Sequence, residues 1–98
     1  MEPKRCIVSV ADIQGIEHSA DVTAATLYEA VALALRAIKS NEWAGEIPEG
    51  LNEIRVSVTG IRVEHKLQIK QFNEWLDRPG RSPADMMHRK RVRELLNG

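Results

Sequence analysis

The sequence contains little of several features that would narrow its class. Its single cysteine, Cys6, excludes an internal disulfide bond. The longest unbroken apolar run, AVALAL at residues 30–35, is far shorter than the ~20 residues that span a bilayer. The N-terminus has basic residues but no long apolar segment of the kind found in secretory signals. These absences favour a soluble, cytoplasmic chain in which Cys6 is a buried, unreactive thiol.

Neither sign of charge is in excess, because 14 basic residues balance 14 acidic ones. The 98 residues have an ordinary globular composition, so we expect one domain over residues 1–98. The charges are unevenly placed: residues 1–50 carry 8 acids and 4 bases, and residues 51–98 carry 6 acids and 10 bases. Such asymmetry is typical of a chain with an anionic partner or of surfaces that pair between two copies of the chain. The alternative is that it has no functional meaning, because folding mixes the two halves.

Motifs that carry catalysis are also missing. The sequence has no GxSxG, no GxGxxG and no GxxxxGK[ST]. Three carboxylates, Glu17, Asp21 and Glu64, fall on the polar side of expected strands, and nothing selects a pair among them for acid–base work. We therefore expect no catalytic residue, no cofactor and no bound metal. A small enzyme or a ligand-binding domain remains an alternative.

What the sequence does contain is alternation of apolar and polar residues over four short stretches, which predicts four half-buried strands at 6–11, 16–22, 53–58 and 61–69. Asp12 and Gly15 suit a tight turn between the first two strands, and Gly60 suits one between the last two. The chain therefore predicts two β-hairpins.

Helical spacing appears in three other stretches. Residues 26–40 open with Thr26 and Glu29 at capping-box spacing, and an apolar stripe predicts that Glu29 and Ala32 face away from the core. Phe72, Trp75 and Leu76 predict a short core-facing helix that ends at Pro79 and Gly80. Ser82 and Pro83 then suit the start of a last helix over 82–96.

The element order is therefore ββαββαα, which predicts an α+β fold with a four-stranded, mainly antiparallel sheet. We expect the long helix to lie across one face of this sheet and the two shorter C-terminal helices to complete the core. The strand order expected for the sheet is 2-1-4-3.

The last helix contains the densest group of bases in the chain. On a helical wheel Met87, Val92 and Leu95 lie on the side expected to dock, and Arg89, Lys90 and Arg93 lie on the side expected to face water. This pattern is typical of a solvated helix face. The alternative is a phosphate-binding surface, whose candidate residues are Arg78, Arg81, Arg89, Lys90 and Arg93. Binding would then be independent of nucleic-acid sequence, since no base-reading motif is present.

Three histidines fall among apolar residues of their elements: His18, His65 and His88. None has the spacing of a metal site, so we expect separate, hydrogen-bonded side chains. We name His18, His65 and Trp43 as candidate residues of an interface or pocket. Trp43 follows the long helix, and we expect its side chain to fold back over the end of that helix. The alternative is an exposed tryptophan, which would favour an interface.

The stretch VSVADIQGIEHSADVTAATLYEAVALAL and the later WLDRPGRSP are similar to segments of a family of short bacterial proteins of about this length. The resemblance covers most of the chain and implies only a bacterial domain of unknown function. The ββαββ order also resembles the β-grasp arrangement of ubiquitin-like domains, which is a resemblance of fold and implies no activity.

Together these observations favour a non-catalytic binding or regulatory module that acts through protein–protein contacts or self-association. Nucleic-acid binding through the basic C-terminal helix is the alternative. We expect no membrane partner.

Overall fold

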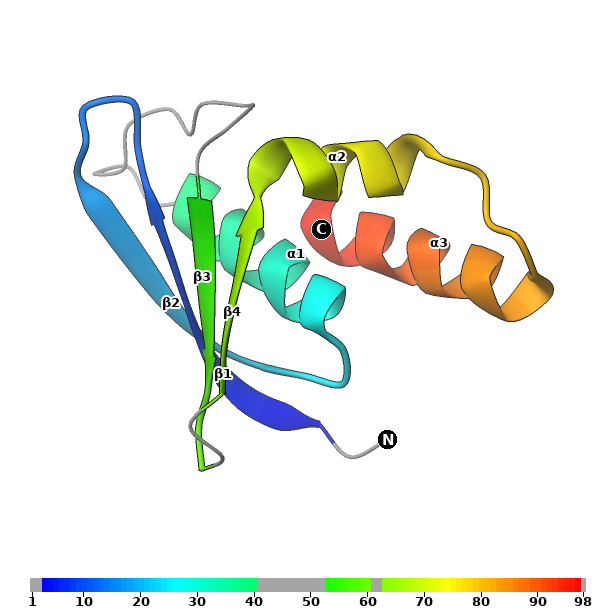
Figure 1. Cartoon of the computed structure of the whole chain (residues 1–98), viewed down its shortest axis with the longest axis horizontal. Coiled ribbons are helices and arrows are strands. Elements are labelled where there is room, and N and C mark those ends of the chain that lie inside the picture. The colour runs from blue at the N-terminus through cyan, green and yellow to red at the C-terminus, as the bar shows by residue number, and fades with distance from the viewer. Residues whose placement is uncertain (1–2, 41–52, 61–62, 98) are drawn as a thin grey trace.

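The computed structural model describes residues 3–40, 53–60 and 63–97. Within them a four-stranded antiparallel sheet forms one layer, and helices pack on one of its faces (Figure 1). The elements follow the order β1 (Lys4–Ala11), β2 (Glu17–Ala24), α1 (Leu27–Lys39), β3 (Glu53–Val58), β4 (Val63–Gln68), α2 (Ile69–Asp77) and α3 (Pro83–Asn97). The predicted α+β class and the ββαββαα order are confirmed.

Both predicted hairpins form, and each turns at a glycine with positive φ. Gly15 has φ 82° between β1 and β2, and Gly60 has φ 94° after β3. Side chains rarely adopt this conformation, so glycine is required at both turns. At the first turn the Asp12 carboxylate accepts hydrogen bonds from the amides of Gln14 (2.9 Å) and Ile16 (3.0 Å).

The strand order is β2-β1-β3-β4, so the expected order 2-1-4-3 is wrong. β3, not β4, pairs with β1, and Val8 lies opposite Val56. The burial of the two strands explains this order. Ile54 and Val56 of β3 are fully buried, whereas His65 of β4 is exposed even though it lies opposite Val56. A strand with a polar residue on its inner face is stable at the edge of a sheet, where less of that face is covered.

All neighbouring strands are antiparallel, including β1 and β3 at the centre. A β-grasp sheet has a parallel pair at its centre, so the β-grasp resemblance is limited to the order of elements along the chain.

Helix α1 is buried on two sides. Thr26 caps it as predicted, with its hydroxyl oxygen accepting from the Glu29 amide at 3.2 Å. One side packs on the sheet and the other packs against α3. For this reason Ala32 and Glu29 are buried, and the prediction that they face away from the core is wrong.

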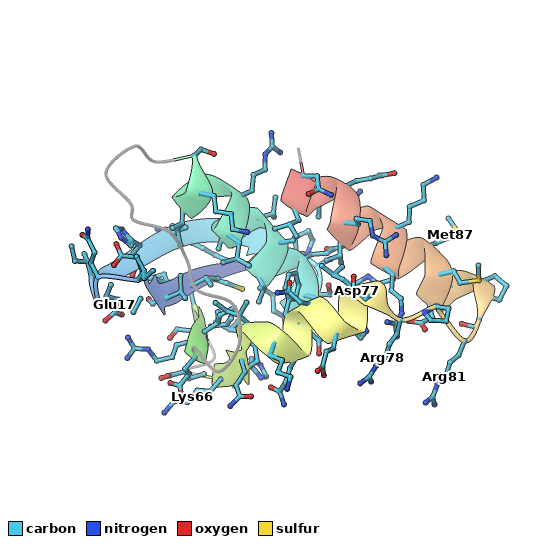
Figure 2. The ribbon with its side chains drawn as sticks, turned by 90° about the horizontal axis from the view of Figure 1, so that it is seen from above. Glu17, Lys66, Asp77, Arg78, Arg81 and Met87 are labelled. Carbon is cyan, nitrogen blue, oxygen red and sulfur yellow. The ribbon has the colours of Figure 1, made fainter. Side chains whose placement is uncertain are left out.

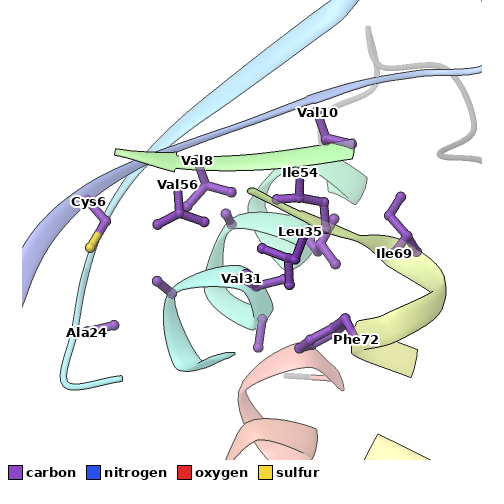
Figure 3. Close-up of a cluster of buried hydrophobic side chains, with 14 of the residues drawn as sticks. Cys6, Val8, Val10, Ala24, Val31, Leu35, Ile54, Val56, Ile69 and Phe72 are labelled. Carbon is purple, nitrogen blue, oxygen red and sulfur yellow. The ribbon is translucent and has the colours of Figure 1, made fainter. Parts of the chain in front are cut away.

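The core lies between the inner face of the sheet and the helices. Valines and isoleucine from β1 and β3 meet Val31 and Leu35 of α1, and α2 adds Ile69 and Phe72 at one end (Figure 3). Cys6 and Ala24 lie at the other end, and Cys6 is buried as predicted. Burial raises the pKa of its thiol, so the group remains neutral.

Candidate functional site

The basic helix α3 uses two of its arginines to bind the end of α2. The last carbonyl groups of a helix have no partner within the helix. Arg89 donates hydrogen bonds to the carbonyl oxygens of Trp75 and Arg78, the latter at 3.3 Å, and Arg93 donates to that of Leu76 at 2.6 Å. Cations at this position also complement the negative end of the α2 dipole.

The prediction that Arg89 faces water is therefore wrong. Only 12% of its side chain is exposed, and its guanidinium lies 4.6 Å from the centre of the Trp75 ring. Asp85, one turn earlier, accepts from the same guanidinium at 3.3 Å. Arg93 remains exposed at the residue level, yet its guanidinium is held by the Leu76 carbonyl. Neither arginine offers a fully available guanidinium to a phosphate.

Trp75 joins the three helices. Its ring stacks on Tyr28 of α1 with centroids 4.2 Å apart, and His88 of α3 meets it edge-on at 5.3 Å. Trp75 is half-buried, while its neighbours Phe72 and Leu76 are buried, so α2 faces the core as its spacing predicts. His88 is thus a packing residue of the helix layer.

The other three residues of the candidate anion site are exposed. Arg78 and Arg81 project from the α2–α3 connection on one side of the molecule (Figure 2), and Lys90 is exposed on α3. Arg78 lies 3.7 Å from a Glu74 carboxylate oxygen, with both side chains open to solvent. The structure therefore divides the predicted cluster into two arginines bound to α2 and three bases in solvent.

The outward face of α3 carries the exposed Met87, and Met86, exposed beside it, lies near Gly80. Met86 is 58% exposed and Met87 is 72% exposed, so the prediction that Met87 docks the helix is wrong. Val92 is fully buried and Leu95 is half-buried, as predicted. The helix is rotated from the expected orientation, and Arg89 and His88 are the α3 side chains that contact the Trp75 ring.

A hollow of about 530 Å³ follows this outward face, which we call the α3 surface. The residues that line it are Ala84, Met87, His88, Lys90, Arg91 and Glu94. Arg91 also forms an ion pair with Glu29 of α1 at 3.0 Å. The Glu29 carboxylate is buried and accepts a further hydrogen bond from the Ala25 amide at 3.2 Å.

Hydrogen bonds of Ser82 and Asp85 stabilise the start of α3. Ser82 caps the helix as predicted, accepting from the Asp85 amide at 3.1 Å, and Asp85 accepts from the Arg81 amide at 3.0 Å. This amide, and to a smaller extent Arg89, lowers the pKa of the Asp85 carboxyl below its ordinary value. Gly80 lies against this turn, and a Cβ there would stand 2.7 Å from the Met86 nitrogen.

The three histidines do not converge. His18 Nε2 lies 2.7 Å from the buried Asp12 carboxylate at the first hairpin, His65 is exposed on β4, and His88 meets Trp75. Across the described ranges no three histidine, cysteine, aspartate or glutamate side chains form a group suited to a metal ion. His18 is hydrogen-bonded as predicted, whereas the partner that the structure gives His88 is the ring of Trp75. His65 takes part in none of the ion pairs and hydrogen bonds that the structure shows within residues 3–40, 53–60 and 63–97.

The open face of the sheet is polar. Glu17 pairs with Arg55 across β1, and Asp21 pairs with Arg5, which lowers the pKa of the Asp21 carboxyl. Between these two ion pairs, the Ser9 and Ser19 hydroxyl oxygens lie 2.8 Å from each other. Each of these two carboxylates thus has an arginine partner. Trp43, the remaining candidate residue, lies outside the described residues.

Sequence reasoning did not identify the exposed Met86–Met87 pair. Successive helical residues point about 100° apart, so both cannot occupy the centre of one docking stripe. That spacing was the available signal. The sequence has no comparable signal for the partners of Arg89. They are backbone carbonyl groups, and every helix ends with carbonyls that lack a partner within the helix.

Comparison with protein-family models, curated proteins and solved structures finds no match to this chain. Among the described residues, no helix combines the length and the apolar character needed to cross a membrane.

Proposed function

We propose that this protein is a small, non-catalytic binding module that recognises a partner protein through the α3 surface. The partner's binding segment would be an acidic, amphipathic helix. The observation that carries the proposal is the exposure of Met87, at 72%, beside a hollow in the surface of α3.

The apolar part of the surface supports a protein partner. A large apolar side chain in water, as Met87 is, has an unfavourable hydration free energy, and a partner that covers it removes that cost. Methionine is flexible and polarisable, and it adapts to the side chains of a docking helix. Ala84 contributes a small residue beside Met87, which allows a close approach by a partner backbone.

The charges around the hollow support an acidic partner. Lys90 lines it, and it takes part in none of the ion pairs among the described residues. Arg81 lies near the start of the same helix with its side chain exposed. Glu94 also lines the hollow, and Arg91 is paired with Glu29, so Lys90 and the nearby Arg81 are the cations open to a partner. Together they outnumber the one acid of the hollow, which favours glutamates on a partner helix over lysines.

Nucleic-acid binding has weaker support than the sequence alone indicated. Arg89 and Arg93 are engaged by α2 carbonyls, which leaves Arg78, Arg81 and Lys90 as the exposed bases of the predicted cluster. Affinity for nucleic acid grows with the number of cations that reach its phosphate backbone. With two fewer available arginines, this surface should bind nucleic acid more weakly than the sequence indicated.

The test uses two labelled helical peptides that share a leucine face and differ only in glutamate or lysine on the polar face. Fluorescence anisotropy measures their binding to the wild type, to Met87→Ser and to Ile13→Ser. Ile13, on the first hairpin, is 63% exposed and is the matched control for an exposed apolar residue. We expect the glutamate peptide to bind the wild type and Ile13→Ser equally, and Met87→Ser at least about tenfold more weakly.

Equal binding of both peptides, or equal loss in both variants, would contradict the proposal. Two further measurements separate the alternatives. Duplex DNA that binds when the glutamate peptide does not would support the phosphate interpretation instead. A dimer in sedimentation analysis that dissociates at high salt would indicate that a second copy is the occupant.

A further inference from the structure

A second hollow lies at the opposite end of the core from α2, and it shares no residue with the α3 surface. Its volume is about 280 Å³, and we call it the Cys6 cleft. Cys6 of β1, Val56 of β3 and the β2–α1 connection line it. The inner face of the sheet continues past the first turn of α1 at this end, whereas α2 follows β4 at the other end (Figure 1).

The floor of the Cys6 cleft is apolar. Val56 is fully buried, Cys6 is 5% exposed and Ala24 is 8% exposed, with Leu27 and Val58 beside them. The raised pKa of the Cys6 thiol keeps it uncharged, so it adds a small apolar surface to the floor. Water on such a floor makes few hydrogen bonds, and an aliphatic chain would replace it favourably.

The rim carries one cation, Lys4, and one imidazole, His65. Lys4 and His65 both line the cleft and are exposed, and neither takes part in an ion pair within residues 3–40, 53–60 and 63–97. Helix α1 begins at the same rim, and the positive end of its dipole lies there. Among the residues that the structure describes, no acidic side chain lines the cleft. An apolar floor with a cationic rim fits a molecule that has an aliphatic tail and an anionic head.

We propose that the Cys6 cleft binds a short-chain aliphatic carboxylate, with its chain on the floor and its carboxylate between Lys4 and His65. This site is independent of the α3 surface, so either proposal can fail without the other. His65 was a candidate pocket residue from the sequence, and the cleft gives it a specific role as a partner for the carboxylate.

The test is a titration followed by amide NMR spectra of the full chain. The probes are hexanoate, hexanol and hexylammonium, which have the same chain and differ in the head group. We expect hexanoate to shift the amide signals of Cys6, Leu27 and Val58 and to saturate at millimolar concentration. Hexanol should bind more weakly and hexylammonium weakest, because only the carboxylate is attracted by the cation at the rim.

Variants locate the site. Lys4→Gln should weaken hexanoate binding about fivefold while leaving hexanol unchanged, as expected for the loss of one partly exposed ion pair. Val58→Phe should fill the cleft and abolish binding of both probes, and Ala25→Leu provides a second filling variant should the first not fold. Lys66→Gln is the matched control, since Lys66 is exposed on the other face of β4.

Two results would overturn the proposal. One is the absence of signal shifts at the cleft with hexanoate when the spectrum shows a folded chain. The other is equal affinity for hexanoate and hexylammonium, or an equal loss in Lys4→Gln and Lys66→Gln, which would show that the rim does not recognise the carboxylate.

Discussion

Arg89 lies over the ring of Trp75, with its guanidinium 4.6 Å from the ring centre, and also donates a hydrogen bond to the Trp75 carbonyl oxygen. One side chain thus contacts both the face of an aromatic ring and the end of the helix that carries it. The contact ties α3 to α2, while α3 packs mainly on α1, where Val92 is fully buried. In this orientation Met87 is exposed to solvent.

The first prediction concerns this contact. Arg89→Met keeps the aliphatic bulk but removes the charge and the donors to the α2 carbonyls. We expect a loss of about 2 kcal/mol in the free energy of unfolding, from the charged hydrogen bonds and the cation–π contact together. Urea denaturation followed by Trp fluorescence measures it. Lys90→Met, at an exposed neighbour, should change stability by less than about 0.5 kcal/mol. Equal effects in the two variants would contradict the assignment.

The second prediction concerns Glu29 and Arg91, which join α1 to α3. Glu29→Gln and Arg91→Gln should each destabilise the chain, and a double-mutant cycle should give a coupling energy of about 1 kcal/mol. The Glu29 side chain is only 8% exposed, so removing Arg91 leaves a buried carboxylate with a weaker set of partners. Additive effects in the cycle would show that the two groups do not interact in solution.

The elements were predictable from sequence because each depends on local spacing. Alternation gave both hairpins, and the Thr26–Glu29 spacing gave the start of α1. The strand order was not predictable from alternation, since alternation assigns side chains to faces and does not assign neighbours to strands. His65 on the inner side of β4 was a usable signal for an edge strand, because a polar residue there avoids full burial.

The candidate site was predicted less well, for a physical reason. A helical wheel treats arginine as polar and places it outside, but its long side chain has an apolar stem and five donors. Arg89 uses both, packing on Trp75 and binding carbonyls. Likewise, Glu29 and Ala32 are buried by α3, an element about sixty residues further along the chain. Such contacts between distant elements leave no local pattern in the sequence.

The third prediction concerns the first hairpin. The Asp12 side chain is fully buried and binds the Gln14 and Ile16 amides and the His18 imidazole. Asp12→Ala should cost about 3 kcal/mol, because it removes the buried carboxylate that these three groups share as a hydrogen-bond partner. The Gln14 and Ile16 amides should then exchange with deuterium faster than in the wild type. Unchanged exchange at these two amides would indicate that the turn is held by other contacts.

The fourth prediction concerns Gly80. A Cβ at this position would lie 2.6–2.8 Å from atoms of Met86, two of which belong to the backbone. Backbone atoms cannot rotate away, so Gly80→Ala should shift the start of α3 and cost about 1–3 kcal/mol. Thermal unfolding measures the cost. Gly80→Ala with wild-type stability would show that the approach of the two segments is looser than the structure indicates.

The fifth prediction concerns pH. The hydrogen bond from the Arg81 amide, with a smaller effect of Arg89, holds the pKa of Asp85 below its unfolded value. The ionised carboxylate therefore stabilises the fold above about pH 4, and this stabilisation is lost as the pH falls through the folded-state pKa. Asp85→Asn should be less stable than the wild type at neutral pH, and the difference should shrink in acid. A difference that is constant with pH would contradict the assignment.

The central claim is that the outward face of α3 is a binding surface for an acidic amphipathic helix. The most direct measurement is the methyl spectrum of methionine-labelled protein as the glutamate peptide is added. We predict that the Met87 methyl signal, assigned with Met87→Leu, moves with saturation, while the lysine peptide leaves it in place. A Met87 signal that does not move with the glutamate peptide, or that moves equally with both, would contradict the account.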